Sequence, residues 1–283
     1  MIYIPFIGAF ALASLTLLEK LVLRKRKINI KSFQVLAFLS SVIIMLPFIY
    51  FFWNVNNQAF ELKNILLFLL VILFSICANL LSFYAVKWEK ITNIEPAKML
   101  EPLFTILIAI AFSFFIPELY ERNFQVIIPA IIAGCALIFS HIRKHHLDFN
   151  KYFLAAILAS LLFSIEMILT RLILDLYSPL SFYFSRCLLI FIISLIIFRP
   201  KLKGTSPKIK IEILLVGLSW VIFRLATYYG YLYLGVISTT LVLMLGPVLV
   251  YIFARTFLKE KLDWRNITSA IIILGCVLYA VLG

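Results

Sequence analysis

Ten long apolar segments follow one another along this chain, and they constrain its fold more than any other feature. A helix that crosses a bilayer needs roughly 17–25 mostly apolar residues, and little chain is left between the segments for a soluble domain. We therefore expect an all-α integral membrane protein with ten transmembrane helices. They are predicted near Ile2–Leu23, Phe33–Trp53, Ile65–Val86, Ile91–Phe115, Phe124–His141, Tyr152–Leu172, Pro179–Phe198, Ile211–Leu232, Gly235–Leu258 and Ile267–Leu282.

The composition excludes several classes of protein. Hydrophobic residues make up 64% of the 283 residues and charged residues only 14%, whereas soluble domains carry about 25% charged residues. A soluble globule of this length has too much surface to hide so many apolar side chains. A soluble enzyme, a disordered chain and a nucleic-acid-binding domain are therefore excluded, and the net charge of +13 indicates contact with anionic lipid.

The basic residues between the segments predict an orientation. Nearly all the loop Lys and Arg residues lie in the odd-numbered loops, and the even-numbered loops hold only Lys63 and Arg122. The positive-inside rule then places the odd-numbered loops in the cytoplasm and both termini outside the plasma membrane.

The two halves of the sequence resemble each other. Residues 99–102 (Met-Leu-Glu-Pro) match 244–247 (Met-Leu-Gly-Pro), and the segment 131–137 matches 272–278. Each half has five predicted spans, an odd number, so the halves insert with opposite orientation, as in many secondary transporters. The predicted units are a first five-helix repeat at 1–141, a basic linker at 142–151 and a second five-helix repeat at 152–283.

Two short motifs carry a family resemblance. An aromatic run at 228–235 precedes the Gly-Pro pair at 246–247, and a Leu-x-Glu-x-Leu pattern ends the segment at 258–262. Weaker copies stand at 83–85, 101–102 and 117–119. With its five-plus-five layout, the whole chain resembles the EamA-like permeases of the drug/metabolite transporter superfamily. The resemblance implies a basket of ten helices around a central cavity and the export or exchange of a small metabolite. It also implies termini in the cytoplasm, which the charge count opposes.

Charged residues inside predicted spans mark candidate binding positions. A charge at the centre of a spanning helix costs roughly 2.5–3.5 kcal/mol. Glu95, Lys98 and Glu101 follow one another at three-residue spacing, so they share one helical face. That face is predicted to line a cavity and contact the substrate, and the alternative is an intrahelical Glu–Lys–Glu ladder near the interface.

Three prolines are predicted to kink their helices. Pro96, Pro102 and Pro247 each lack a backbone N–H and disrupt the bond to the carbonyl four residues earlier. A freed carbonyl that faces a cavity binds polar groups, and a kinked helix can act as a gate. The alternative is a structural kink whose carbonyl is satisfied by neighbouring helices.

Arg224 is the leading candidate for a substrate contact. It lies in the middle of the eighth segment, and its counterpart in the repeat is Asn79 in the third. Both are predicted to face the interior, because both are polar within an apolar run. A guanidinium is always ionised and suits a carboxylate or phosphate, and Tyr228 follows one turn later on the same face. The alternative is a permanent salt bridge to Glu95, Glu101 or Glu166.

Glu19 and Glu166 occupy matching places in the first and sixth segments. A carboxyl group set in an apolar wall readily takes up a proton, which proton coupling requires. Both residues are therefore candidates for proton coupling. The alternatives are that Glu19 pairs with the basic block after it and that Glu166 belongs to a structural ion pair.

These features together predict a secondary transporter rather than an enzyme. The first half supplies acidic groups and the second half supplies Arg224, a combination that suits a small polar or zwitterionic metabolite, such as an amino acid, moved by alternating access. The alternative is a membrane-embedded lipid-handling protein, either a flippase for a lipid or polyprenyl carrier or a lipid-processing enzyme.

The expected partners are the solute, the bilayer and protons. No HExxH, GxSxG or P-loop motif is present, and we expect no cofactor, no metal, no nucleic acid and no direct use of ATP. The sequence leaves open the substrate, the direction of transport, the coupling ion and the oligomeric state.

Overall fold

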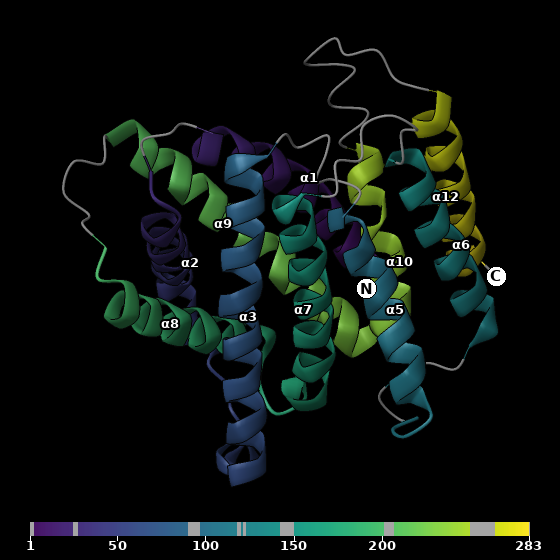
Figure 1. Ribbon diagram of the computed structural model, residues 1–283. Helices are drawn as coiled ribbons and strands as arrows, with labels where there is room; N and C mark the ends of the chain where they lie inside the picture. Colours follow the sequence, from purple (N-terminus) through teal and green to yellow (C-terminus); the bar gives the residue numbers. More distant parts are fainter. Residues whose placement is uncertain are drawn as a thin grey trace.

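The computed structural model describes residues 3–24, 28–89, 97–117, 120, 123–141, 150–200, 207–249 and 264–282. Within these ranges the chain forms ten α-helices, one short 3-10 helix and no extended strand (Figure 1). Each predicted segment overlaps at least one helix. In chain order the elements are α1 (Tyr3–Arg24), α2 (Ile30–Phe52), η1 (Asn57–Phe60), α3 (Leu62–Trp88), α5 (Leu100–Ser113), α6 (Phe124–His141), α7 (Lys151–Leu174), α8 (Pro179–Phe198), α9 (Pro207–Tyr233), α10 (Val236–Leu243) and α12 (Trp264–Leu282).

The described helices confirm the predicted all-α membrane fold. Helices α2, α3, α7 and α8 are long and apolar enough to cross a bilayer, and shorter apolar stretches lie in α1, α5, α6, α10 and α12. Many large apolar side chains, such as Tyr50, Leu73 and Ile271, point outward. A soluble monomer exposes apolar patches of only a few hundred Å², so this outer surface suits hydrocarbon. That all ten helices span the membrane stays a prediction.

The helices pack in pairs that join the two halves of the sequence. The most extensive contacts are α3 with α7, α1 with α9, α2 with α8 and α6 with α12, and Figure 1 shows the last pair at one edge. Helices α3 and α7 run antiparallel, because the Tyr84 and Tyr152 rings lie 5.2 Å apart at one end and the Phe68 and Tyr177 rings 5.8 Å apart at the other.

Helical structure is interrupted at matching positions in the two halves. Met99 precedes α5 with φ −69° and ψ −8°, and Met244 follows α10 with φ −63° and ψ −11°. Each methionine lies three residues before a proline, Pro102 or Pro247. The two breaks therefore have nearly the same backbone conformation. A separate sharp turn joins α9 to α10 at Gly235. Its φ of 85° is a backbone conformation that glycine adopts readily and other residues rarely adopt.

Two loops from different halves form an inter-loop bridge, made of residues 54–56 and 176–178. Two backbone hydrogen bonds of 2.8 and 2.9 Å join them around an isolated β-bridge. The Ser178 hydroxyl also donates to Phe52 O at 2.7 Å, and Asn54 N donates to Ser181 Oγ at 2.8 Å. Burial raises the pKa of Tyr177 in this bridge. The bridge therefore fastens the two halves at the end of the molecule where α7 ends.

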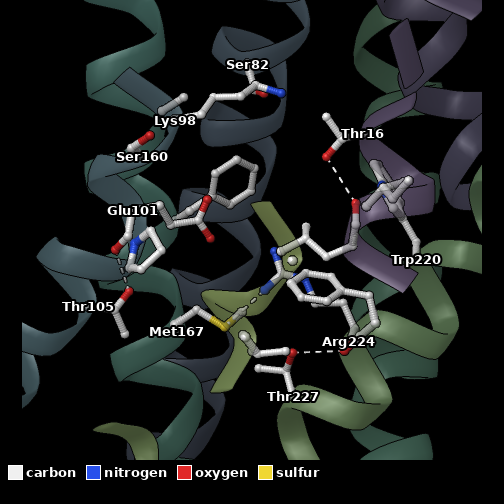
Figure 2. A pocket seen from close by; sticks show the side chains of 18 of the residues that line it. Thr16, Ser82, Lys98, Glu101, Thr105, Ser160, Met167, Trp220, Arg224 and Thr227 are labelled. Carbon is white, nitrogen blue, oxygen red and sulfur yellow. Dashed lines mark hydrogen bonds between the residues drawn. The ribbon is translucent and has the colours of Figure 1, made fainter. Parts of the chain in front are cut away.

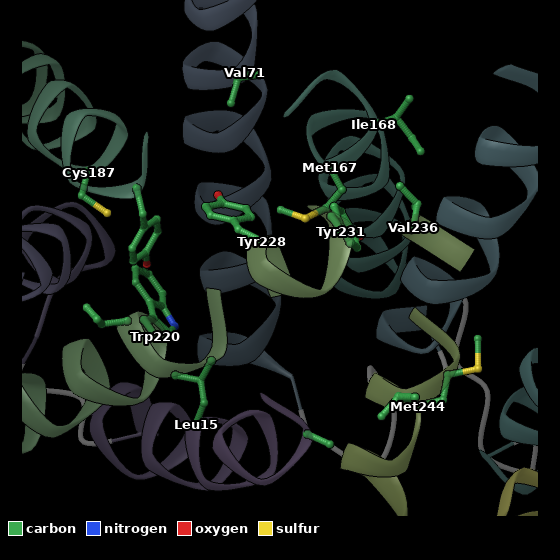
Figure 3. Close-up of a cluster of buried hydrophobic side chains, with 14 of the residues drawn as sticks. Leu15, Val71, Met167, Ile168, Cys187, Trp220, Tyr228, Tyr231, Val236 and Met244 are labelled. Atoms are coloured by element: carbon green, nitrogen blue, oxygen red, sulfur yellow. The ribbon is translucent and has the colours of Figure 1, made fainter. Parts of the chain in front are cut away.

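The core between the helices is rich in aromatic rings and sulfur. Met167, Cys187 and Tyr228 come from α7, α8 and α9 and are fully buried or nearly so (Figure 3). Tyr228 lies 5.4 Å from the Phe182 ring and 5.9 Å from the Tyr183 ring in edge-to-face contacts. Such contacts add stability beyond burial alone, and they fix the helices that carry the polar groups described next.

Candidate functional site

A cavity of about 180 Å³ opens between the two halves of the chain. Its walls come from α1, α2, α3 and α5 in the first half and from α7, α8, α9 and α10 in the second. Rings such as Phe83, Phe163 and Phe223 supply much of the apolar wall. The charged residues that line it are Glu19, Lys98, Glu101, Arg186 and Arg224.

The cavity extends toward the end of the molecule that lies opposite the inter-loop bridge. It is lined by Asn79 and Ser82 from the second half of α3, by Lys98 just before α5 and by Glu101 in the first turn of α5. The end of α3 meets the start of α7 at this end, where Asn150 donates to Glu89 at 2.5 Å. The bridge stands at the other end of α7.

A buried cluster from the second half backs one wall of the cavity. Glu166 on α7 is fully buried, and its Oε1 lies 3.1 Å from Arg186 Nη2 on α8. Arg186 also donates to the Tyr228 hydroxyl at 2.5 Å and to Ser75 Oγ on α3 at 2.7 Å. Charge-assisted hydrogen bonds of this kind are stronger than neutral ones, so Arg186 is held firmly from three helices.

Arg224 on α9 is held much more loosely. Its Nη2 lies 3.7 Å from Glu166 Oε2, which is beyond hydrogen-bonding distance. Its Nη1 donates to the Met167 sulfur at 3.0 Å, and a thioether is a weak acceptor. The rings of Phe163 and Phe223 flank the guanidinium at 5.7 and 5.5 Å. The side chain is 11% exposed and lines the cavity, where its remaining donors can meet a ligand.

Glu101 and Lys98 face Arg224 from the first half of the chain. Figure 2 shows the Glu101 carboxylate and the Arg224 guanidinium pointing toward one another across the cavity. Within the described residues neither Glu101 nor Lys98 has a side-chain ion pair within 4 Å. The backbone at Glu101 is fixed, because Ser164 Oγ donates to its carbonyl at 2.8 Å and Thr105 Oγ1 at 2.9 Å. The arrangement presents opposite charges from two sides of one space.

Comparisons with known proteins point to one family. Residues 150–282 match the model of the EamA-like transporter family. The second half of this chain is therefore similar to the EamA-like transporter family. A solved crystal structure, described simply as that of a protein, covers 99% of this chain and 95% of its own with a TM-score of 0.73 at 16% identity, which shows a shared fold. No curated protein matches the chain.

The family match confirms the resemblance that the sequence motifs predicted. It is consistent with the drug/metabolite transporter superfamily, whose members are membrane proteins with small-molecule substrates, and with the membrane-capable helices of this chain. The match covers the half that carries Glu166, Arg186 and Arg224. It names no substrate.

The structure brings most of the predicted site residues of this EamA-like protein to one cavity. Lys98, Glu101, Asn79 and Arg224 line it together. The other predicted residues in its wall are Glu19, Pro102 and Pro247. Glu95 and Pro96 lie outside the described residues.

Two predicted residues lie behind the cavity wall. Tyr228 is fully buried and meets Arg186 rather than the open space. Of the two described acidic residues proposed as partners of Arg224, Glu166 is the nearer, and it is bound more closely by Arg186. Its neighbour Arg171 pairs instead with Asp175 at 2.6 Å. Glu166 thus has the geometry of the ion-pair alternative.

Sequence reasoning missed Trp220 as a site residue. Its indole N–H donates to Glu19 Oε1 at 2.9 Å in the cavity wall. A tryptophan in the middle of an apolar segment is the signal that could have found it, because tryptophans favour the membrane interface and a buried indole N–H needs an acceptor.

Proposed function

We propose that this chain is a secondary transporter that exports or exchanges a small zwitterionic metabolite, such as an amino acid, by alternating access. The observation that carries the proposal is the pair formed by Glu101 and Arg224 on opposite walls of one cavity. An ammonium group would bind Glu101, and a carboxylate would bind Arg224 in the forked geometry that a guanidinium favours. The solute would then touch both halves of the protein.

The charge balance of the site supports a zwitterion over an anion. Among the described residues, the groups in or directly behind the cavity wall are three acids and three bases. They are Glu19, Glu101, Glu166, Lys98, Arg186 and Arg224. A solute with no net charge keeps this balance, whereas a sugar phosphate with two negative charges would need an excess of cations. The volume of about 180 Å³ is below the roughly 300–1,000 Å³ typical of drug-sized ligands, which favours a small solute.

The helix contacts support the two inverted repeats, 1–141 and 152–283, that alternating access needs. In the predicted repeat α1 corresponds to α7, and α3 corresponds to α9. Exchanging each helix for its counterpart therefore turns the α3–α7 pair into the α9–α1 pair, and the contacts within both pairs are extensive. The α2–α8 and α6–α12 pairs each join a helix to its own counterpart. The matching breaks at Met99 and Met244 follow the same exchange. Broken helices at the contact between repeats are a feature of substrate sites in such transporters.

The inter-loop bridge suggests which end of this conformation is closed. It fastens residues 54–56 of the first half to 176–178 of the second, and the cavity extends toward the opposite end. Rocking of the halves would separate these loops and close the cavity at the other end. The bridge would therefore act as the outer or inner gate of the pathway, according to the orientation of the chain in the membrane.

Transport by purified protein in proteoliposomes tests the proposal. Vesicles loaded with one unlabelled amino acid at a time are assayed for uptake of the same labelled compound. We expect uptake for at least one member of the panel and a loss of at least tenfold in Arg224→Gln and Glu101→Gln. Lys210→Gln, an exposed charge on the same helix as Arg224, serves as the matched control. No exchange with any amino acid, or normal exchange in both variants, would overturn the proposal.

A further inference from the structure

Two arginines contact one glutamate in the second half, and they do so unequally. Arg186 lies 3.1 Å from Glu166 Oε1 and has two further partners, while Arg224 lies 3.7 Å from Glu166 Oε2. The side chain of Arg186 is 2% exposed and that of Arg224 is 11% exposed. Arg186 is therefore the fixed partner of Glu166, and Arg224 is the partner that can leave.

Neither Arg224 nor Glu166 is fully satisfied in this arrangement. Glu166 Oε2 is buried and has no hydrogen-bond partner among the described residues, which is unfavourable for a carboxylate oxygen. Arg224 has five N–H donors, of which one meets only the Met167 sulfur. A shift of about 1 Å toward Glu166 would complete a charge-assisted bond. A shift into the cavity would complete the same kind of bond with a ligand.

We infer that Glu166 is a positioning residue that competes with the carboxylate of the solute for Arg224. This inference rests on the proposed function of the cavity. When the cavity is empty, Glu166 holds Arg224 against the wall. When a solute binds, Arg224 turns to its carboxylate, and Glu166 keeps Arg186. Glu166, Arg186 and Arg224 each keep an ionic partner in either state, which matters because an unpaired buried charge is strongly destabilising. The competition lowers affinity and speeds release.

Binding and turnover of Glu166→Gln separate this role from a purely structural one. The amide keeps the shape of the side chain and removes the charge that draws Arg224 away. We expect the solute to bind about fivefold more tightly, because the ion pair that is lost is a weak one whose atoms lie 3.7 Å apart, and we expect the maximal exchange rate to fall. Asp175→Asn is the matched control, because it removes another acid at the end of the same helix, away from the cavity. Unchanged or weaker binding in Glu166→Gln would overturn the inference.

A measurement on the wild-type protein covers the case in which Glu166→Gln does not fold. In a structure with bound solute, the separation between Arg224 Nη2 and Glu166 Oε2 should exceed 3.7 Å, while the contact between Arg186 and Glu166 persists. A separation that stays the same or shortens would overturn the inference. Failure of the wild-type protein to bind any amino acid would instead refute the proposed function, so the two failures are distinguishable.

Discussion

Replacing Ser178 and Ser181 together by alanine loosens the inter-loop bridge by an amount that its geometry defines. The double change removes two good hydrogen bonds between the halves, from Ser178 Oγ to Phe52 O at 2.7 Å and from Asn54 N to Ser181 Oγ at 2.8 Å. Each is worth about 0.5–1.5 kcal/mol net, so the closed conformation loses about 1–3 kcal/mol. The bond from Ser181 N to Ser178 Oγ caps α8 within one half, so its loss affects both conformations equally.

This loss should shift the balance between the conformations by about 5- to 150-fold. The assay uses a cysteine at Thr227, a buried residue of the cavity wall, in a protein whose four native cysteines are replaced. A membrane-impermeant thiol reagent is added from the side of the bridge. Labelling should be faster in the double variant by about the same factor.

The control for this experiment is Ser14→Ala, which removes a bond within a single helix. It should leave the labelling rate of the Thr227→Cys protein unchanged. Equal labelling rates with an intact and a loosened bridge would show that residues 54–56 and 176–178 are not the closed gate.

Three further predictions concern stability in detergent, measured by thermal unfolding. Arg186→Met leaves Glu166 with the distant Arg224 as its ionic partner and with a long hydrogen bond from Thr170, and it should lower the free energy of unfolding by about 3–5 kcal/mol; an unchanged melting temperature would contradict the proposed ion-pair cluster. Gly217→Ala places a methyl group against Ser40 Oγ and should cost about 1–3 kcal/mol; Ser40→Ala in the same chain should recover part of this loss, and purely additive effects would contradict the contact. Gly235→Ala forces a side chain into positive φ and should cost about 1–3 kcal/mol, whereas a neutral effect would show that the turn relaxes freely.

The helices and the charged positions of the cavity could be predicted from the sequence for one reason. Hydrocarbon accepts neither an unpaired backbone group nor a lone charge. Apolar length therefore indicates where helices lie, and Lys98, Glu101 and Arg224 within apolar runs indicate which faces turn inward. All three line the cavity.

The partners of the buried groups could not be predicted in the same way. Arg186 reaches Ser75, which is 111 positions away in the sequence, and only the packing of α3 against α8 brings them together. Tyr228 follows Arg224 by one helical turn, yet the long side chain of Arg186 reaches it first. The apolar lining, such as Phe163, escaped prediction because rings that face lipid and rings that face a cavity look alike in a sequence.

Binding of a zwitterion and its two singly charged analogues to the wild-type protein tests the central claim most directly. An amino acid that exchanges is compared by calorimetry with its carboxamide, which keeps only the positive charge, and with its N-acetyl derivative, which keeps only the negative charge. A hydrogen bond to a charged group contributes about 1.5–3 kcal/mol, so the amino acid should bind at least about tenfold more tightly than either analogue. Equal binding of either analogue would show that Glu101 and Arg224 do not act together on one solute.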